Sequence, residues 1–416
     1  MRVVHVNLSD RSGGAAIACQ RLHEELVRFG VDSQLLVYVK VGEEDSRVHE
    51  IATGGEYQIR RVQAKLSNYL SRLQRDPSSF HSSTNLFSNN LIQRIEALKP
   101  DLVHLHWVGG NILQISDLGR IKYPLVWTHH DMWPFCGSEH YSYSQRWLEG
   151  YSSSNRDASA SGLDLDRWTW ERKKSDWAGV SINHVGPSRW MKDCAASSAL
   201  WKDSTGSRFS VIANGLDTDV FRPNDTHESR LLFGISEELP VLLFGAHSVE
   251  SSIKGGDLLK KVTEELSERG MQFQIVTFGR GNFDAPIGVP YLNVGVVYDC
   301  EILAKLYSCA DVMLVPSRLE AFGQTASEAM ACGVPVSAFD TSGLRDIVDH
   351  QVNGYLAECF DIADFANGVQ WCLANVPKDC ADRIREKPLA VFQVDQCASQ
   401  YHSLYEQILN NNGISR

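Results

Sequence analysis

Short apolar, β-branched runs alternate with amphipathic helical patterns along most of the chain, and this alternation restricts the fold more than any other feature. Residues 3–8, 32–39 and 125–128 are such runs in the first half. The pattern starts again with a run at 241–245 and a helical pattern at 255–268. Strands that alternate with helices make right-handed crossovers and build parallel sheets. The sequence therefore predicts an α/β fold with two parallel sheets, one in each half.

Composition narrows the class of protein. A chain of 416 residues corresponds to roughly two or three domains. The formal net charge of −11 argues against a nucleic-acid partner, because nucleic-acid-binding domains usually carry a basic excess. Ten cysteines, none in a Cys-x-x-Cys pair, fit reduced thiols better than disulfides or a zinc site. The chain has no apolar stretch of about 18 residues, and residues 1–6 predict a strand and not a signal peptide. We therefore expect a cytoplasmic protein.

Residues 312–336 carry the strongest chemical signal. An apolar run ends at Pro316, a loop with Glu320 and Gly323 follows, and good helix formers come next. A glycine-bearing loop between a strand and a helix presents backbone N–H groups to an anion. Glu320 and Glu328 lie on either side of that helix start. Because carboxylates repel phosphate, the two acids are better suited to bind the hydroxyls of a ribose or a sugar ring.

The spacing Glu320-x7-Glu328, followed by Ala-Met-Ala-Cys-Gly-Val-Pro-Val, resembles the signature of the retaining glycosyltransferases of family 4, or glycosyl transferases group 1. The resemblance implies the GT-B fold, in which two Rossmann-like domains with parallel sheets face each other across a cleft. It implies an acceptor-side domain at residues 1–222, with a C-terminal helix at about 390–416 returning to it. The nucleotide-sugar-binding domain is then expected at 223–389.

The run Thr-His-His-Asp-Met-Trp-Pro-Phe, from Thr128 to Phe135, resembles a subgroup of the family that acts in polysaccharide and glycoconjugate assembly. In that subgroup the histidine that matches His130 faces the donor sugar, so the resemblance implies a catalytic role for His130. Members of the subgroup often carry several cysteines just downstream, whereas only Cys136 is present here. We therefore expect no metal site in this loop.

The resemblance also implies roles for residues of the second half. Lys254, in Ile-Lys-Gly-Gly, matches a lysine that stabilises the departing diphosphate, and it joins His130 and Glu320 as a predicted catalytic residue. Glu328 is expected to bind the ribose hydroxyls and Glu320 the transferred sugar. Three residues are open as substitutes for an arginine that the family usually carries and this chain lacks: His247, Arg280 and Arg318. The predicted donor-binding residues are Gly13, Gly14, Asn214, Gly215, Lys254, Arg318, Glu320, Phe322, Gly323, Gln324, Thr325 and Glu328.

The implied function is retaining transfer of a sugar from a nucleotide diphosphate sugar to a saccharide or lipid-linked acceptor, in cell-surface polysaccharide or glycoconjugate biosynthesis. The donor is expected to be UDP- or GDP-linked, with no cofactor and no metal. Two alternatives stay open. One is a GT-B enzyme of another reaction class, a phosphorylase or an epimerase. The other is an inactive scaffold protein on this fold, which the missing arginine keeps open.

Residues 57–75 predict an amphipathic helix whose charges are all basic. The apolar residues that recur at helical spacing are Ile59, Val62, Leu66, Tyr69, Leu70 and Leu73. The basic residues are Arg60, Arg61, Lys65, Arg72 and Arg75. The apolar stripe fits two interpretations: it packs against its own domain, or the helix lies on an anionic membrane. The second would place the protein at the inner face of the membrane.

Overall fold

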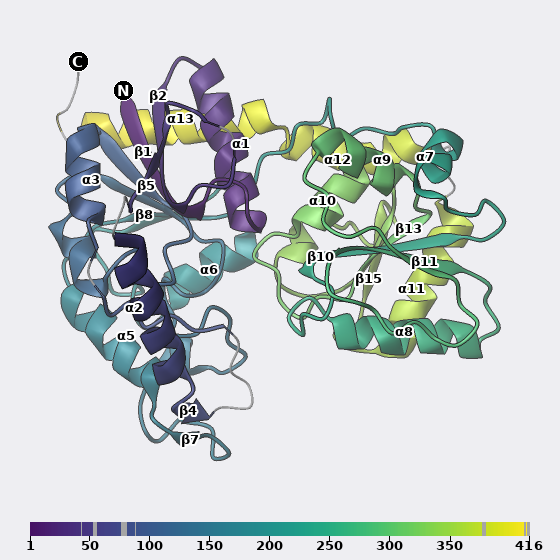
Figure 1. Ribbon diagram of the computed structural model, residues 1–416, viewed down its shortest axis with the longest axis horizontal. Coiled ribbons are helices and arrows are strands. Elements are labelled where there is room, and N and C mark those ends of the chain that lie inside the picture. The colour runs from purple at the N-terminus through teal and green to yellow at the C-terminus, as the bar shows by residue number, and fades with distance from the viewer. Residues whose placement is uncertain are drawn as a thin grey trace. The chain divides into compact units, whose positions relative to one another are not determined.

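The computed structural model describes residues 1–42, 44–52, 56–75, 81–87, 89–376, 380–411 and 413, without the side chains of residues 57 and 60. The chain forms two compact units (Figure 1). Unit 1 comprises Met1–Ile212 and Ala398–Arg416, and unit 2 comprises Ala213–Cys397. Each unit contains one large parallel sheet with helices packed on it. The predicted α/β fold with two Rossmann-like parallel sheets is therefore confirmed.

Unit 1 is built on a seven-stranded sheet with the order β3-β2-β1-β5-β6-β8-β9, in which every neighbouring pair is parallel. Its strands are β1 (Arg2–Ser9), β2 (Asp32–Val39), β3 (Val48–Glu50), β5 (Leu102–Leu105), β6 (Leu125–Thr128), β8 (Asn183–Gly186) and β9 (Arg208–Val211). Its helices are α1 (Gly14–Arg28), α2 (Glu56–Ser71), α3 (Leu91–Leu98), α4 (Arg146–Glu149), α5 (Leu165–Asp176), α6 (Arg189–Ser197), α13 (Val394–Asn411) and the 3₁₀ helix η1 (Ile115–Arg120). A short antiparallel pair joins β4 (Gln74–Arg75) to β7 (Ser161–Gly162).

Strand β1 shows how the sequence builds this sheet. The side chains from Val3 to Val6 are all buried, as expected for a parallel strand covered on both faces. Helix α13, at the end of the chain, packs on the same sheet. The hydroxyl of Tyr405 lies 2.7 Å from Nδ1 of His104 on β5, and the hydroxyl of Tyr401 lies 2.8 Å from Oγ1 of Thr128 on β6.

Unit 2 is built on a six-stranded parallel sheet with the order β12-β11-β10-β13-β14-β15. Its strands are β10 (Val241–Ser248), β11 (Gln274–Arg280), β12 (Tyr291–Asn293), β13 (Val312–Val315), β14 (Val336–Phe339) and β15 (Gly354–Ala357). Its helices are α7 (Thr226–Phe233), α8 (Gly256–Glu268), α9 (Cys300–Ser308), α10 (Gln324–Ala331), α11 (Ile362–Asn375), α12 (Ala381–Val391) and the 3₁₀ helix η2 (Ser342–Asp346). Apolar clusters cover both faces of the sheet, since alternate residues of β10 and β13 belong to different clusters.

The prediction of one helix over residues 57–75 is wrong at its C-terminal end. Helix α2 ends at Ser71, and Gln74–Arg75 forms strand β4. Just past the helix end the backbone bonds span three residues: the N–H of Arg72 donates to the carbonyl of Tyr69, and the N–H of Leu73 donates to that of Leu70. The two residues that follow then pair with β7.

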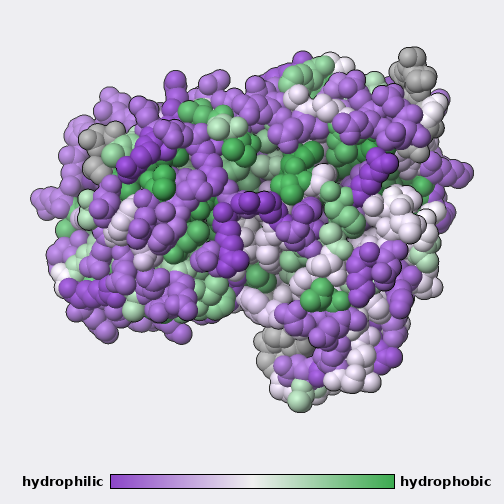
Figure 2. Space-filling view, turned by 180° about the vertical axis from the view of Figure 1, so that it is seen from behind, coloured by the Kyte–Doolittle hydropathy of each residue, from purple (hydrophilic) through white to green (hydrophobic). Residues whose placement is uncertain are grey.

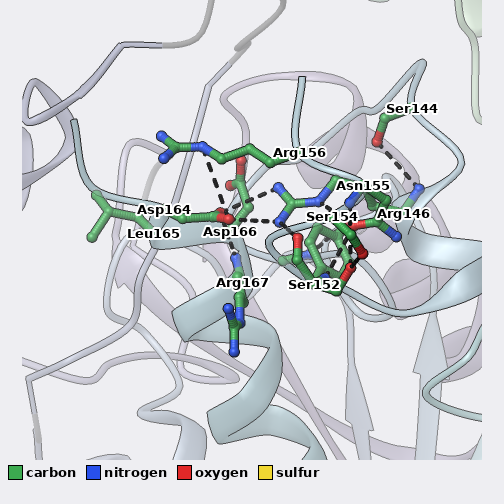
Figure 3. A network of polar contacts seen from close by, with 12 residues as sticks. Ser144, Arg146, Ser152, Ser154, Asn155, Arg156, Asp164, Leu165, Asp166 and Arg167 are labelled. Carbon is green, nitrogen blue, oxygen red and sulfur yellow. Dashed lines mark hydrogen bonds and ion pairs between the residues drawn. The ribbon is translucent and has the colours of Figure 1, made fainter. Parts of the chain in front are cut away.

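The loop between α4 and α5 is fixed by a polar network around Arg146 (Figure 3). The guanidinium of Arg146 donates to both carboxylate oxygens of Asp164, at 3.2 and 2.7 Å. It also donates to Oδ1 of Asn155 at 3.2 Å and to the carbonyl of Ser152 at 3.1 Å. Asp164 caps α5 by accepting from the N–H of Arg167. One buried arginine thereby connects the start of this loop to its end.

The surface carries mostly polar side chains. On the face shown in Figure 2, hydrophilic residues predominate and hydrophobic ones form small, separate patches. None of the helices in the described part of the chain combines the length and the hydropathy that a membrane span requires.

Candidate functional site

The centre of the candidate site in unit 2 is an ion pair between Lys254 and Glu320. Nζ of Lys254 donates to both carboxylate oxygens of Glu320, each at 2.7 Å. The hydroxyl of Ser317 donates to Oε1 of the same carboxylate at 2.9 Å. Glu320 is 5% exposed, so its charge depends on these partners. Lys254 follows β10 and Glu320 follows β13, two neighbouring strands whose carboxyl ends meet at one edge of the sheet.

Two glycines bring the loop of Lys254 against the loop of Glu320. Gly255 has a φ of +77°, and a Cβ there would lie 1.9 Å from the carbonyl oxygen of Pro316. A Cβ at Gly256 would lie 2.2 Å from the carbonyl oxygen of Val249. Because only glycine fits at both positions, the Lys-Gly-Gly sequence permits the approach of the two loops.

A third loop, after β14, holds the backbone of Glu320. The N–H of Glu320 donates to Oγ of Ser342 at 2.9 Å, and its carbonyl accepts from the N–H of Gly343 at 2.9 Å. Ser342 adopts a φ of +47°, which is uncommon for a residue other than glycine. Loops from three adjacent strands therefore fix the position of Glu320.

Glu328 lies one helical turn inside α10. It is 4% exposed, and its Oε2 accepts a hydrogen bond of 2.9 Å from the hydroxyl of Tyr307 on α9. Tyr307 is fully buried. The tyrosine thus orients one carboxylate oxygen of Glu328 from the core side.

The N-terminus of α10 offers hydrogen-bond donors. Gly323, with a φ of +114°, precedes the helix, and no side chain of a described residue caps its first turn. A Cβ at Gly323 would lie 2.9 Å from Leu344. Nε2 of Gln324 is buried and has no hydrogen-bond partner among the described residues. Phe322 packs edge-on against Phe392 in the core, so only its backbone is available to a ligand. Thr325 is the second residue of the helix.

Arg318 is already engaged in an ion pair. Its guanidinium makes two hydrogen bonds of 2.6 Å to the carboxylate of Asp257 and one of 2.6 Å to the carbonyl of Ser252. His247 and Arg280, the other candidates for the missing arginine, lie on the neighbouring strands β10 and β11. Burial and the charge of Arg280 lower the pKa of His247. Arg280 makes no ion pair within the part of the chain that the structure describes.

Asn214 and Gly215 lie where the chain enters unit 2. A Cβ at Gly215 would lie 2.9 Å from Cα of Val394. This glycine allows the N–H of Leu216 to donate to the carbonyl of Phe392 at 2.7 Å. Among the described residues, no hydrogen bond joins Asn214 or Gly215 to the Lys254–Glu320 pair.

In unit 1, the β1–α1 connection carries Gly13 and Gly14. Gly13 has a φ of +90° and precedes α1, and within the described part of the chain no side chain caps the first turn of the helix. Gly14 is the exposed first residue of α1. The N–H groups at this helix start are therefore open to a ligand.

His130 lies two residues beyond the end of β6, and it is the outer member of a chain of histidine rings. Its Nε2 lies 3.0 Å from Nδ1 of His106, and Nε2 of His106 lies 3.0 Å from Nδ1 of His5. Burial lowers the pKa of His130 to about 4, against an opposing effect of Asp131. The ring is therefore neutral at neutral pH, and its Nδ1 makes no hydrogen bond to a described residue.

Asp131 belongs to a Ser–His–Asp arrangement that the sequence analysis missed. Its Oδ2 lies 2.5 Å from Nδ1 of His140, and Nε2 of His140 lies 2.8 Å from Oγ of Ser83. Burial raises the pKa of Asp131, but His140 together with hydrogen bonds from Trp133 and Trp107 outweighs this effect, so the pKa is lowered. All three side chains are buried, and Oγ of Ser83 accepts from the N–H of Gly110. We interpret the trio as the anchor of the loop that follows His130; no sequence motif links Ser83 to it.

The region downstream of Cys136 holds a buried polar cluster. The hydroxyl of Tyr151 donates to Glu139. Burial and the neighbouring Asp166 raise the pKa of Glu139 well above its ordinary range. Nζ of Lys173 donates to three backbone carbonyls of the loop between residues 133 and 137. Hydrogen bonds and one lysine therefore organise this loop.

One group of side chains has the composition of a metal site. Ring nitrogens of His5 and His106 and the sulfur of Cys19 lie within 4.8 Å of one another, all buried. Both nitrogens of His106 already contact other histidine rings. Burial raises the pKa of Cys19, which keeps the thiol protonated. With three ligands and a neutral thiol, the group fits a hydrogen-bonded cluster better than a zinc site, which takes four ligands or three with an open position.

Family models match both units. The model of Glycosyltransferase Family 4 matches residues 12–220, and that of Glycosyl transferases group 1 matches residues 234–387. The D-inositol 3-phosphate glycosyltransferase of Geodermatophilus obscurus is 35% identical over 185 residues, 40% of this chain and 40% of that protein. The protein of the same name from Corynebacterium jeikeium is 28% identical over 335 residues, 76% of this chain and 74% of that protein. The chain thus spans about 40% of the length of several curated relatives that it matches.

Solved structures share the whole fold. Sucrose-phosphate synthase from Thermosynechococcus elongatus has a TM-score of 0.70 at 18% identity, covering 99% of this chain and 100% of that one. HepE of Anabaena, solved in complex with UDP-glucose, has a TM-score of 0.68 at 16% identity, covering 98% and 100%. At these identities the likeness concerns the fold, which is that of the GT-B glycosyltransferases. The family models and the fold agree that this chain is a member of glycosyltransferase family 4.

Proposed function

We propose that this protein transfers a sugar from a nucleotide diphosphate sugar to a hydroxyl of a saccharide or lipid-linked acceptor, with retention of the anomeric configuration, in the biosynthesis of a cell-surface polysaccharide or glycoconjugate. The observation that carries the proposal is the Lys254–Glu320 pair, which three loops hold beside the open N-terminus of α10. The UDP-glucose in HepE supports a nucleotide sugar as donor. The names of the curated relatives support glycosyl transfer.

In this proposal the donor binds unit 2. The N–H groups of Gln324 and Thr325 and the ammonium of Lys254 face the diphosphate, where negative charge develops as the sugar leaves. Glu328 accepts hydrogen bonds from the ribose hydroxyls, and Glu320 contacts the sugar. The bond between the anomeric carbon and the diphosphate breaks, and the acceptor oxygen bonds to that carbon from the same side. The acceptor proton moves to the departing diphosphate, so no enzyme base is required.

Arg280 is the best substitute for the missing arginine. The two hydrogen bonds of Arg318 to Asp257 make that guanidinium part of the scaffold. Arg280 is exposed at the end of β11, beside His247 and at the same edge of the sheet as the loop of Lys254. We therefore assign it to the diphosphate, and Arg318 to positioning the loop.

We propose further that α2 binds an anionic membrane surface, with the protein on the cytoplasmic side. Most of its apolar stripe turns away from unit 1: exposure ranges from 45% at Leu66 to 66% at Val62, whereas Leu70 is half-buried. Its polar side faces the unit, where Oγ of Ser67 accepts from Asn111 at 2.9 Å. Packing of the stripe on its own domain is therefore wrong for the exposed residues. Basic residues on a chain of net charge −11 give α2 a local affinity for anionic lipid.

Donor binding and turnover test the proposed function. The purified protein is heated with a panel of UDP-, GDP- and ADP-sugars at about 1 mM, the upper end of ordinary KM values. A donor that binds the folded state raises the melting temperature, and Glu328→Ala should remove that rise. Release of nucleotide in the presence of acceptor then separates a transferase from an inactive scaffold, and NMR of the product shows its anomer. No stabilisation and no release with any donor would refute the proposal.

A further inference from the structure

We propose that His130 presents a hydrogen-bond donor, the N–H of Nδ1, to its ligand, and that His106 and His5 fix this tautomer as positioning residues. The three rings cross three adjacent strands of unit 1. His130 follows β6, His106 follows β5 and His5 lies within β1. The identity of the ligand rests on the proposed function; the tautomer does not.

All three rings are neutral at neutral pH, because burial lowers each pKa. A neutral imidazole has one nitrogen that donates and one that accepts. The rings contact one another nitrogen to nitrogen, each time at 3.0 Å. Each contact needs one donor and one acceptor, so the three protons must all be ordered in the same direction.

Two ordered states exist. In the outward state, Nδ1 of His5 donates to Nε2 of His106, and Nδ1 of His106 donates to Nε2 of His130. His130 then keeps its own proton on Nδ1. In the inward state every proton lies on Nε2, and the row of histidine rings ends with an N–H at Nε2 of His5.

The surroundings of His5, the innermost of the three rings, decide between the two states. Nε2 of His5 is buried and has no hydrogen-bond partner among the described residues. The inward state would place an N–H donor there without an acceptor, and buried N–H groups without acceptors are rare in proteins. The outward state is favoured.

The outward state determines what His130 can do. Its Nδ1 makes no hydrogen bond to a described residue, so this N–H is the atom that meets a ligand. An N–H donates to an oxygen, such as a sugar hydroxyl or a phosphate oxygen, and it cannot remove a proton. His130 therefore binds and orients an oxygen of the substrate and is not a general base.

Nitrogen NMR of the full-length protein, labelled with ¹⁵N-histidine and free of donor, tests the tautomer. The expected result is a protonated Nδ1 and a bare Nε2 on His130 and His106, with the signals assigned from His130→Gln and His106→Gln. His5→Gln removes the inner donor, so the Nε2–H form of His130 should increase. His104→Gln is the matched control, since His104 is equally buried but bonds only to hydroxyls. A wild-type His130 protonated on Nε2 overturns the proposal even if the variants fail to fold.

Transfer assays test the consequence separately. An asparagine side chain can place its N–H near the position of Nδ1, whereas glutamine reaches the position of Nε2. His130→Asn should therefore keep a kcat/KM about tenfold higher than His130→Gln, the value of one hydrogen bond. Equal losses in the two variants would contradict the donor role. An absence of transfer in the wild-type protein would count against the proposed function and leave the NMR result standing.

Discussion

Lys254 and Glu320 are 66 residues apart in the chain, yet Nζ of Lys254 lies 2.7 Å from each carboxylate oxygen of Glu320. The pair joins the loop after β10 to the loop after β13. Both oxygens of Glu320 accept from the same ammonium; the side chain of Lys254 is 34% exposed, while Glu320 is almost completely buried. The lysine therefore compensates the buried carboxylate from the solvent side and remains accessible to a second anion.

Replacing Lys254 by methionine should lower kcat/KM about 10²- to 10³-fold, because a preorganised positive group opposite the departing diphosphate is lost. The melting temperature should fall as well, because the buried carboxylate of Glu320 loses its charged partner. Steady-state kinetics at varied donor concentration, together with a melting curve, measure both effects.

The double variant Lys254→Met, Glu320→Gln separates these contributions. It should recover most of the lost stability, because no buried charge is left unpaired, without recovering the activity. Recovery of activity in the double variant would show that Lys254 serves only to neutralise Glu320. A double-mutant cycle gives the coupling between the two residues.

Tyr307→Phe should raise the KM for the donor several-fold and leave kcat nearly unchanged. The hydroxyl of Tyr307 donates to Oε2 of Glu328 at 2.9 Å and orients the carboxylate, but it does not touch the reacting atoms. One such hydrogen bond contributes about 0.5–1.5 kcal/mol. Tyr291→Phe is a suitable control, because its hydroxyl bonds to Thr277 in the same sheet. An equal change of KM in both variants would mean that the effect is not specific to Glu328.

The parts of the fold that local pattern specifies were predictable. Residues 312–315 form β13 as expected, because a run of four apolar residues that ends at a proline is typical of a buried strand. The start and stop of α10 follow from Gly323 and Gly333. The orientation of α2 could not be predicted, because a helical period shows that a stripe exists and not which way it faces. Contacts with residues distant in the chain show that the polar side packs inward: Ser67 bonds to Asn111, and Ser71 bonds to Ser82.

The sequence identified residues of the candidate site but not the side chains that contact them. Sequence placed Lys254, Glu320 and Glu328 in the site, and their assignment to the donor stays a prediction. It also placed Arg318 there, whereas the structure pairs this arginine with Asp257, which no motif indicated. His130 contacts His106 after the neighbouring strand β5, and His106 in turn contacts His5 on β1. A one-dimensional pattern does not contain such cross-strand contacts.

Charge reversal on α2 should abolish binding to anionic membranes. Arg61→Glu combined with Lys65→Glu changes the local charge by four and leaves the exposed apolar stripe intact. Electrostatic attraction contributes about 1 kcal/mol per basic residue near an anionic surface. Sedimentation with vesicles of mixed anionic and neutral lipid measures the bound fraction. The variant should stay in the supernatant and keep its melting temperature, since both side chains are exposed.

Two controls test the contributions of lipid charge and of the apolar side chains separately. Vesicles of neutral lipid alone should bind the wild-type protein weakly, because a neutral surface does not attract the basic residues. Val62→Ser, which removes an exposed apolar side chain without changing charge, should weaken binding to anionic vesicles. No binding of the intact protein to any vesicle would eliminate the membrane proposal.

The protein should lose stability steeply as the pH falls from about 6.5 to about 4, because unit 1 buries neutral histidines. Burial lowers the pKa of His23 and His130 to about 4 and that of His184 to about 3. In the unfolded chain these groups titrate near 6.5. Between the two values the unfolded state binds more protons, so each histidine destabilises the fold by up to about 1.4 kcal/mol per pH unit. Urea unfolding from pH 8 to pH 5 should show the loss begin below the unfolded pKa, and His184→Phe should make the slope shallower. If the urea concentration at the unfolding midpoint stayed constant across this pH range, the buried rings would not be neutral. The tautomer of His130 depends on the same neutral state.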